Sequence, residues 1–179
     1  MVKLTALGPF DGLLPREIGG VTLTALDLGP AFSVAPYRGR AQEVSEALEA
    51  ALGLPLPAPN RATEAAGGAR AVWTGPGQAL VLAQWLPDLP GAAVSEQGDG
   101  LAALRAGGPA AETVLARLVP VDLRPRALEE GHTVRTLVGH MTASVTRTAQ
   151  GLEIMVFRSM AATLVDELVE AAEGVAARG

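Results

Sequence analysis

The stretch of residues 133–159, TVRTLVGHMTASVTRTAQGLEIMVFRS, contains three apolar segments separated by glycine-containing turns. Apolar residues in 141–148 alternate with threonine and serine, which gives a strand one apolar and one polar face. The segment 151–159 is apolar on both faces, a pattern typical of a central strand that is covered on both sides. Together with 133–138, these segments predict three consecutive strands.

Helical patterns lie on both sides of this region. The last predicted helix covers residues 160–174, with its aliphatic side chains on one face and Ser159 as its N-cap. An earlier helix covers residues 40–53, and Gly53 is its predicted C-terminal stop. A third helix begins at Pro109, because proline is favoured in the first turn of a helix.

The N-terminal half predicts further strands. Alternating residues at 21–28 and an apolar run at 31–35 indicate two of them. Ala69–Trp73 and Ala79–Trp85 predict a hairpin around the turn TGPG, and residues 92–108 predict two short strands separated by glycines.

The order of these elements indicates an α+β fold built of ferredoxin-like units, with helices on one face of a mostly antiparallel sheet. Residues 1–20 are broken by glycine and proline and predict an irregular N-terminal arm. Residues 21–179 are expected to form a single α+β domain. Two ferredoxin-like halves, about 21–90 and 91–179, are one interpretation of its internal organisation.

The composition of the chain argues against several classes of function. The chain has 179 residues, of which 49% are hydrophobic, so it can bury a core. Its net charge of −5 and its 3% aromatic content argue against nucleic-acid binding. The absence of cysteine excludes disulfides and thiolate chemistry. We find no signal peptide and no apolar run long enough for a membrane helix, and therefore expect a cytoplasmic protein without a membrane partner.

Catalytic motifs are scarce. His132 and His140 are separated by eight residues, a spacing that matches no standard zinc pair, so we predict no metal site. Glycines at 107–108 precede a proline that removes a backbone amide, so a structural turn is favoured over a phosphate loop. No GxSxG motif is present, and we predict no catalytic residues.

Arginines are the more informative charged residues. The members of this group are Arg124, Arg126, Arg135, Arg147 and Arg158. A guanidinium group pairs bidentately with a carboxylate, so these residues could hold an anionic ligand, or could form ion pairs within the fold or with another subunit. We favour ion pairs, and we interpret the proline-framed Asp122 as a turn or capping residue rather than a catalytic acid.

Five pieces of the sequence, in their order and spacing, are similar to the gamma subunits of heterotetrameric sarcosine oxidases, over residues 30–175. The pieces are ALGLPLPAPN (51–60), WTGPGQALVLA (73–83), AVSEQGDGLAALRAGGPAAETVLARLVPVDL (93–123), GHTVRTLVGH (131–140) and VFRSMAATLVDELVEAA (156–172). Within them the signature residues are Gly75, Pro76, Gly108, Pro109, Pro120, Asp122, Leu123, Arg135, Thr136, Arg158 and Ser159.

The resemblance implies a shortened form of the folate-binding fold of aminomethyltransferases such as the glycine-cleavage T-protein. It further implies a heterotetramer with alpha, beta and delta subunits, in which flavins, NAD and tetrahydrofolate are held by the other subunits and zinc by the delta subunit. The gamma subunit is then a non-catalytic partner, inactive on its own. Two features depart from the family pattern: Gly77–Gln78–Ala79 replaces an acidic and an aromatic residue, and no residue matches the aspartate of the full aminomethyltransferases.

The first hypothesis is therefore an assembly subunit of a sarcosine oxidase, which contacts the large subunit through residues 1–20 and an arginine-bearing surface. The alternative is a stand-alone folate- or carboxylate-binding module that uses Arg135, Arg147 or Arg158. An independent aminomethyltransferase is disfavoured by the short chain. For the isolated chain, a homodimer remains an option.

Overall fold

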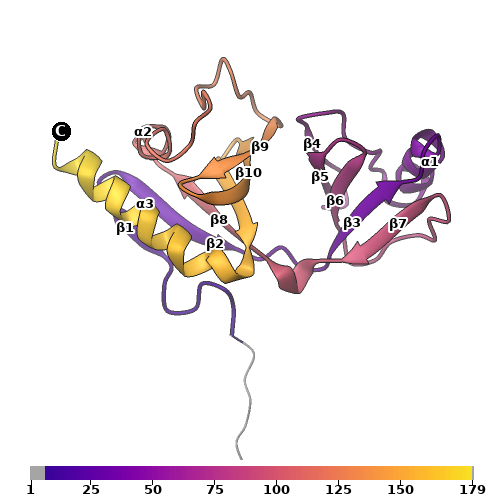
Figure 1. Ribbon diagram of the computed structural model, residues 1–179, viewed down its shortest axis with the longest axis horizontal. Helices are drawn as coiled ribbons and strands as arrows, with labels where there is room; N and C mark the ends of the chain where they lie inside the picture. Colours follow the sequence, from indigo (N-terminus) through magenta and orange to yellow (C-terminus); the bar gives the residue numbers. More distant parts are fainter. Residues whose placement is uncertain (1–6, 179) are drawn as a thin grey trace, which may run out of the picture.

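The computed structural model describes residues 7–178. These residues form two antiparallel sheets and three α-helices, arranged as two lobes that meet near the 3-10 turn Gly98–Gly100 (Figure 1). The predicted α+β class with antiparallel sheets and helices is confirmed. Of the predicted N-terminal arm, residues 1–6 lie outside the described residues.

The larger sheet contains the stretch 133–157 and has six strands. In spatial order they are β1 (Arg16–Ile18), β2 (Val21–Leu26), β8 (Leu101–Gly107), β11 (Gly151–Phe157), β10 (Met141–Thr148) and β9 (Thr133–Val138). The three strands predicted from 133–159 are present, and β11 is central, between β8 and β10. One expectation for β11 is wrong: its second face is not wholly apolar, because it carries the buried Glu153.

The smaller sheet has five strands. In spatial order they are β4 (Ala62–Glu64), β5 (Arg70–Gly75), β6 (Gln78–Leu82), β3 (Ala31–Pro36) and β7 (Ala92–Glu96). The hairpin predicted around TGPG is the β5–β6 pair. This sheet is contiguous in the chain, whereas the larger sheet takes β1 and β2 from one side of it and β8 to β11 from the other.

The expected internal boundary near residue 90 therefore does not coincide with the sheets. β2, which that division assigned to the first half, pairs with β8 in the second. The described part of the predicted arm is also less irregular than expected. Arg16–Ile18 pairs with β2, and the Phe10 side chain is 3% exposed in the core of the larger lobe.

Helices cover the outer face of each sheet. The helix α1 (Ala41–Leu52) buries Val44 and Leu48 against the smaller sheet, and it ends at Gly53, whose φ of 67° allows the left-handed cap that the sequence predicts. The helices α2 (Ala111–Leu115) and α3 (Ala161–Ala176) pack on the larger sheet. The predicted N-cap is wrong: a 3-10 turn, Arg158–Met160, precedes α3, and Met160 occupies the cap position.

The inner faces of the two sheets lie against each other. A small apolar cluster joins them, with Ala31, Leu80 and Leu82 from the smaller sheet and Leu101 and Met155 from the larger. A cavity of only about 20 Å³ remains between the sheets in this region. The two lobes are therefore in direct contact, and the polar groups buried between them determine how they are held.

Candidate functional site

The loop between α2 and β9, in the middle of the stretch 119–147, is anchored by Arg147. Its Nε donates to the carbonyl of Leu128 at 2.7 Å, its Nη2 donates to the carbonyl of Leu123, and the same Nη2 lies 2.9 Å from Glu112 Oε1. The Arg147 side chain is 13% exposed. Because its donors are directed at this chain's own backbone and at Glu112, Arg147 holds the loop in place rather than presenting a free guanidinium.

Asp122 and Arg124 form a local ion pair within the same loop. One Asp122 oxygen accepts hydrogen bonds from the Arg124 backbone N–H at 3.0 Å and from its Nε at 2.8 Å. The Arg124 side chain holds the pKa of the Asp122 carboxyl well below its usual range. This arrangement is a turn closed by its own side chains, with the carboxylate ionised at neutral pH, and it gives Asp122 no proton to donate as a general acid.

In the described residues, neither histidine belongs to a group of side chains that could bind a metal ion. His132 lies 3.8 Å from Glu129 across one turn of the loop, and His140 is exposed in the β9–β10 turn. Across residues 7–178, no three histidine, aspartate or glutamate side chains are close enough to share a metal ion. None of the helices in the described part of the chain is long and apolar enough to cross a membrane.

Arg135 and Arg158, the other candidate ligand-binding arginines, are exposed. Arg135 on β9 reaches Ser144 Oγ at 3.5 Å, and Arg158 donates to the backbone carbonyl of Leu7. Arg147 lies on the face of β10 opposite to that of Ser144 and Arg135, and Arg158 lies in the turn before α3. The three arginines therefore do not form one anion-binding cluster.

The signature residues shared with the resembling family occupy turns and core positions. Gly75 and Pro76 form the β5–β6 turn, and Leu123 is 3% exposed in the core of the larger lobe. Gly108 has a φ of 96°, and a Cβ there would lie 2.4 Å from the carbonyl oxygen of Gly20. The remaining members are placed as follows: Pro109 before α2, Pro120 and Asp122 in the anchored loop, Thr136 on β9 and Ser159 in the 3-10 turn.

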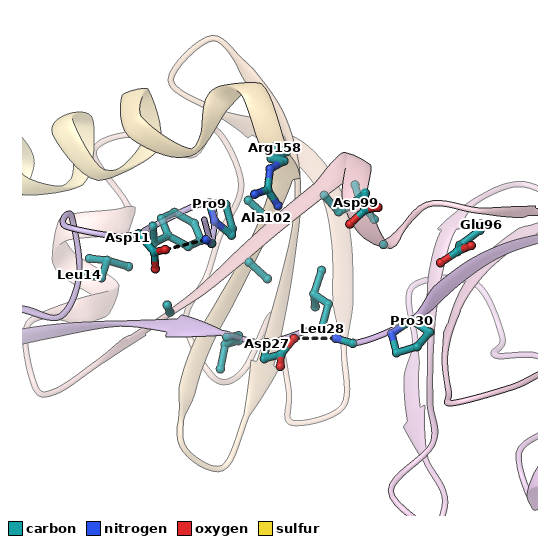
Figure 2. Close-up of a pocket in the computed structure, with 18 residues that line it drawn as sticks. Pro9, Asp11, Leu14, Asp27, Leu28, Pro30, Glu96, Asp99, Ala102 and Arg158 are labelled. Carbon is teal, nitrogen blue, oxygen red and sulfur yellow. Dashed lines mark hydrogen bonds between the residues drawn. The ribbon is translucent and has the colours of Figure 1, made fainter. Parts of the chain in front are cut away.

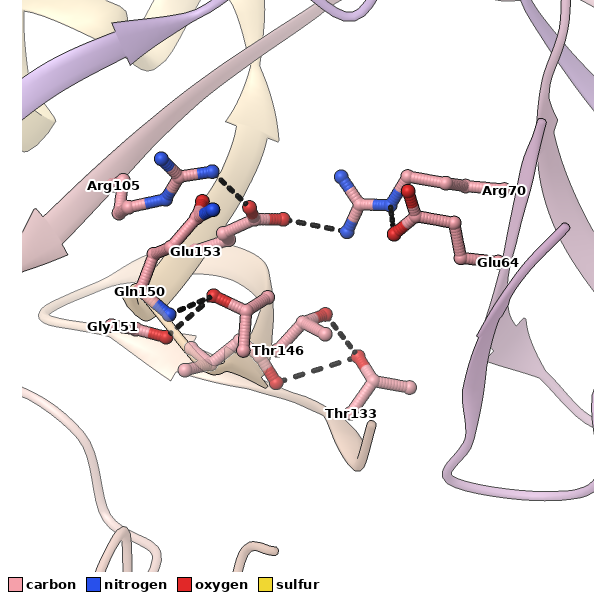
Figure 3. Close-up of polar contacts among 10 residues, drawn as sticks. Glu64, Arg70, Arg105, Thr133, Thr146, Gln150, Gly151 and Glu153 are labelled. Atoms are coloured by element: carbon pink, nitrogen blue, oxygen red, sulfur yellow. Dashed lines mark hydrogen bonds and ion pairs between the residues drawn. The ribbon is translucent and has the colours of Figure 1, made fainter. Parts of the chain in front are cut away.

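A buried polar cluster between the sheets was not predicted. It consists of Glu153 on β11, Arg105 on β8 and Arg70 on β5, and we call it the Glu153 cluster. Arg70 Nη2 lies 2.7 Å from Glu153 Oε2, and Arg105 Nη2 lies 2.9 Å from Glu153 Oε1 (Figure 3). Glu64 adds a more distant contact, 3.9 Å from Arg70 Nε. One carboxylate thus connects the two lobes.

Glu153 is ionised in spite of its burial. Burial alone would raise its pKa, but the hydrogen bonds and charges of Arg105 and Arg70 outweigh that effect and lower the pKa below its ordinary value. Two cations then face one buried anion, so the cluster carries a net positive charge. A sequence signal for this site existed: Glu153 is the one charged residue within the apolar strand 151–157, and such a residue needs a partner.

A large cleft lies on a different part of the surface. It has a volume of about 680 Å³ and extends from the N-terminal turn at 8–14 across the β2–β3 connection to the 3-10 turn Gly98–Gly100. The charged residues that line it are Asp11, Asp27, Glu96, Asp99 and Arg158 (Figure 2). We call it the acidic cleft, because it has four carboxylates and one guanidinium.

This charge balance does not fit folate or another carboxylate ligand. Four carboxylates around the opening would repel an anion, and the single cation, Arg158, already donates to the carbonyl of Leu7. We therefore assign no folate-binding residue in the cleft.

No protein-family model and no curated protein sequence matches this chain. Among solved structures, a chain of heterotetrameric sarcosine oxidase from Corynebacterium sp. U-96, in complex with pyrrole 2-carboxylate, superposes with a TM-score of 0.81 at 23% identity and covers 96% of both chains. Glycine cleavage system aminomethyltransferase T from Bartonella henselae superposes with a TM-score of 0.56 at 16% identity, over 85% of this chain and 46% of that one. The predicted fold is therefore confirmed: this chain has the fold of a chain of heterotetrameric sarcosine oxidase, related to part of an aminomethyltransferase.

Proposed function

We propose that this chain is a non-catalytic, gamma-type subunit of a heterotetrameric sarcosine oxidase complex in the cytoplasm. The complex would demethylate sarcosine oxidatively to glycine and pass the one-carbon unit to tetrahydrofolate. The observation that carries the proposal is the shared fold, which extends over 96% of this chain and 96% of the sarcosine oxidase chain. A match over 96% of both chains favours a role like that of the matched chain.

The side chains support a structural rather than a catalytic role. The buried charges are used to hold the lobes together, Arg147 holds a loop, and Asp122 is held ionised by Arg124. We therefore assign the chemistry, and the flavins, NAD and tetrahydrofolate that it requires, to alpha, beta and delta partner subunits. The contribution of this chain is a rigid surface against which those subunits assemble.

The N-terminal residues need a more careful test than deletion. We expected residues 1–20 to form part of the contact with the large subunit, and their removal would be the simplest experiment. Phe10 is buried in the core, however, and β1 pairs with β2, so deleting residues 1–20 would also damage the fold. Substitutions at exposed positions separate assembly from folding better than truncation does.

The proposal is tested by purifying the affinity-tagged chain from the native cell extract. We expect a yellow complex that contains a large and a medium subunit, has a flavin absorbance spectrum and oxidises sarcosine with release of peroxide. The chain produced alone should be colourless and inactive toward sarcosine. Sarcosine turnover by the isolated, flavin-free chain would contradict the proposal, and so would recovery of the chain without any partner under conditions in which it is folded.

The alternative, a stand-alone folate- or carboxylate-binding module, is disfavoured by two observations. Arg147 is committed to backbone carbonyls and to Glu112, and four of the five charged residues that line the acidic cleft are carboxylates. Equilibrium dialysis with tetrahydrofolate is a direct measurement of this alternative. We expect no saturable binding to the isolated chain.

A further inference from the structure

We infer that the acidic cleft is the surface on which a partner subunit docks, and that the docking segment carries lysine or arginine beside apolar side chains. This inference rests on the proposed function, because it names the face through which the chain enters the complex. It differs from our first expectation of an arginine-bearing contact surface. The cleft provides a concave shape with four carboxylates gathered around it, whereas the candidate arginines lie on separate parts of the structure.

The shape of the cleft suits an inserted segment. Its volume of about 680 Å³ is comparable to that of a site for several side chains. Much of its lining is apolar, with Phe10 and Leu14 from the N-terminal turn, Leu26 and Leu28 from the β2–β3 connection, and Leu101 from β8. Covering an apolar lining of this kind stabilises the complex, because it removes apolar surface from water. The apolar residues would form the water-excluding centre of the contact.

The charge of the cleft selects the occupant. Asp11, Asp27, Glu96 and Asp99 are all exposed, and within residues 7–178 none of them is within ion-pair distance of a cation. Among the described residues, the only cation that lines the cleft is Arg158, so the carboxylates outnumber it four to one. A cationic segment would therefore be attracted to the cleft from a distance and retained there, whereas an acidic one would be repelled.

An exposed apolar rim lies beside the charges. Phe157 is 52% exposed and Met160 is 40% exposed, and they flank Arg158, which lines the cleft. Leu7 is 66% exposed, and its carbonyl accepts the hydrogen bond from Arg158, so it lies on the same edge. An aromatic residue and a methionine are the side chains that typically anchor a protein contact, with charged groups around them.

The sequence makes one experiment unusually specific. Lys3 is the only lysine of the chain, so a zero-length carbodiimide cross-link from a cleft carboxylate to any other lysine must reach a different protein. We would cross-link the affinity-purified complex and map the products by mass spectrometry. The expected result is a link from Glu96, Asp99, Asp11 or Asp27 to a lysine of the large or the medium subunit. Links from these residues only to Lys3, in the same chain or in a second copy, would overturn the inference.

Matched charge-reversal variants give the second readout. The pair Glu96→Lys and Asp99→Lys should reduce partner recovery at least tenfold at moderate salt, because it replaces two attractive charges with two repulsive ones. The control pair, Glu46→Lys and Glu49→Lys on the exposed face of α1, changes the net charge equally but lies in a different part of the surface. Equal recovery with both pairs would overturn the inference.

A neutral substitution separates docking from folding. Phe157→Ala removes a half-exposed ring, so the isolated chain should unfold at nearly the same urea concentration, while partner recovery falls. The two proposals also fail in different ways. If the wild-type chain recovers no flavin-containing partner, the proposed function fails. If it recovers the partner but the cleft variants bind as the controls do, only the docking surface is wrong.

Discussion

Glu153 is a single carboxylate that two arginines share across the interface between the lobes. Replacing it with alanine leaves Arg70 and Arg105 facing each other with only the more distant Glu64 as a counter-charge, at positions where they are 24% and 27% exposed. Removal of one partner from a buried ion pair is strongly destabilising, so we expect Glu153→Ala to lower the free energy of unfolding by about 3 kcal/mol in urea denaturation. The matched control is Glu64→Ala, whose exposed carboxylate lies 3.9 Å from Arg70 and should contribute less than about 1 kcal/mol.

The same residue predicts a dependence on pH. The pKa of Glu153 is lowered on folding, so the unfolded chain takes up its proton at a higher pH than the folded chain does. The stabilisation is therefore fully present above the unfolded pKa, near 4.5, and is lost as the pH falls through the lower folded value. The free energy of unfolding of the wild-type protein should fall more steeply below this pH than that of Glu153→Gln. Parallel curves would show that Glu153 is not the titrating group.

Arg147 provides a test of the loop between α2 and β9. Arg147→Met retains the aliphatic stem but removes the hydrogen bonds to the carbonyls of Leu123 and Leu128 and the contact with Glu112. Hydrogen bonds from a charged group are each worth about 1.5–3 kcal/mol, so we expect a loss of at least 2 kcal/mol. Hydrogen exchange should accelerate in residues 119–131 and remain unchanged in α1. Unchanged exchange in the loop would mean that Arg147 does not anchor it.

The turn between β10 and β11 depends on one glycine. Gly151 has a φ of 135°, and a Cβ there would lie 2.5 Å from the carbonyl oxygen of Ala106 on the neighbouring strand β8. Gly151→Ala must therefore strain the backbone and separate two central strands, and we expect a loss of about 2–3 kcal/mol in urea denaturation. Gly75→Ala in the β5–β6 turn is the control, because its Cβ meets no atom within 4 Å and should change stability by less than about 0.5 kcal/mol.

The elements differ in how well the sequence predicted them. Strands such as β10, in which apolar and polar residues alternate, are found where that pattern predicts them. β1 and β4 were missed, because three residues cannot show a period. The prediction that Ser159 caps the last helix was wrong because Ser159 lies in the 3-10 turn Arg158–Met160 that precedes α3. The Arg70–Glu153 pair joins residues 83 positions apart, so no local pattern could identify it.

The whole molecule consists of two lobes with separate cores. The larger lobe is packed around α2 and α3, and the smaller around α1. Between them lie a small apolar cluster, with Leu82 and Met155 among its members, the Glu153 cluster, and backbone hydrogen bonds from Ala62 to Gly131 and from Thr133 to Asn60. The contact surface proposed for a partner, the acidic cleft, includes residues of both lobes, such as Leu101 from the larger sheet and Glu96 from the smaller. Its shape therefore depends on how firmly the lobes are held together.

This coupling can be measured with the protein's own chromophores. Both tryptophans, Trp73 and Trp85, lie in the smaller lobe, so tryptophan fluorescence reports its unfolding, while far-ultraviolet circular dichroism reports both lobes. We expect the two urea curves of the wild-type protein to coincide, as they do for a cooperative transition.

In the double variant Arg70→Met and Met155→Ala, which removes an ion pair and an apolar contact from the interface, the fluorescence curve should separate from the dichroism curve. Val44→Ala, which weakens the core beneath α1 and leaves the interface intact, should shift both curves together. Coincident curves in the double variant would mean that the lobes are coupled by contacts other than the Glu153 cluster and Met155, and separated curves in the wild type would mean that they fold independently.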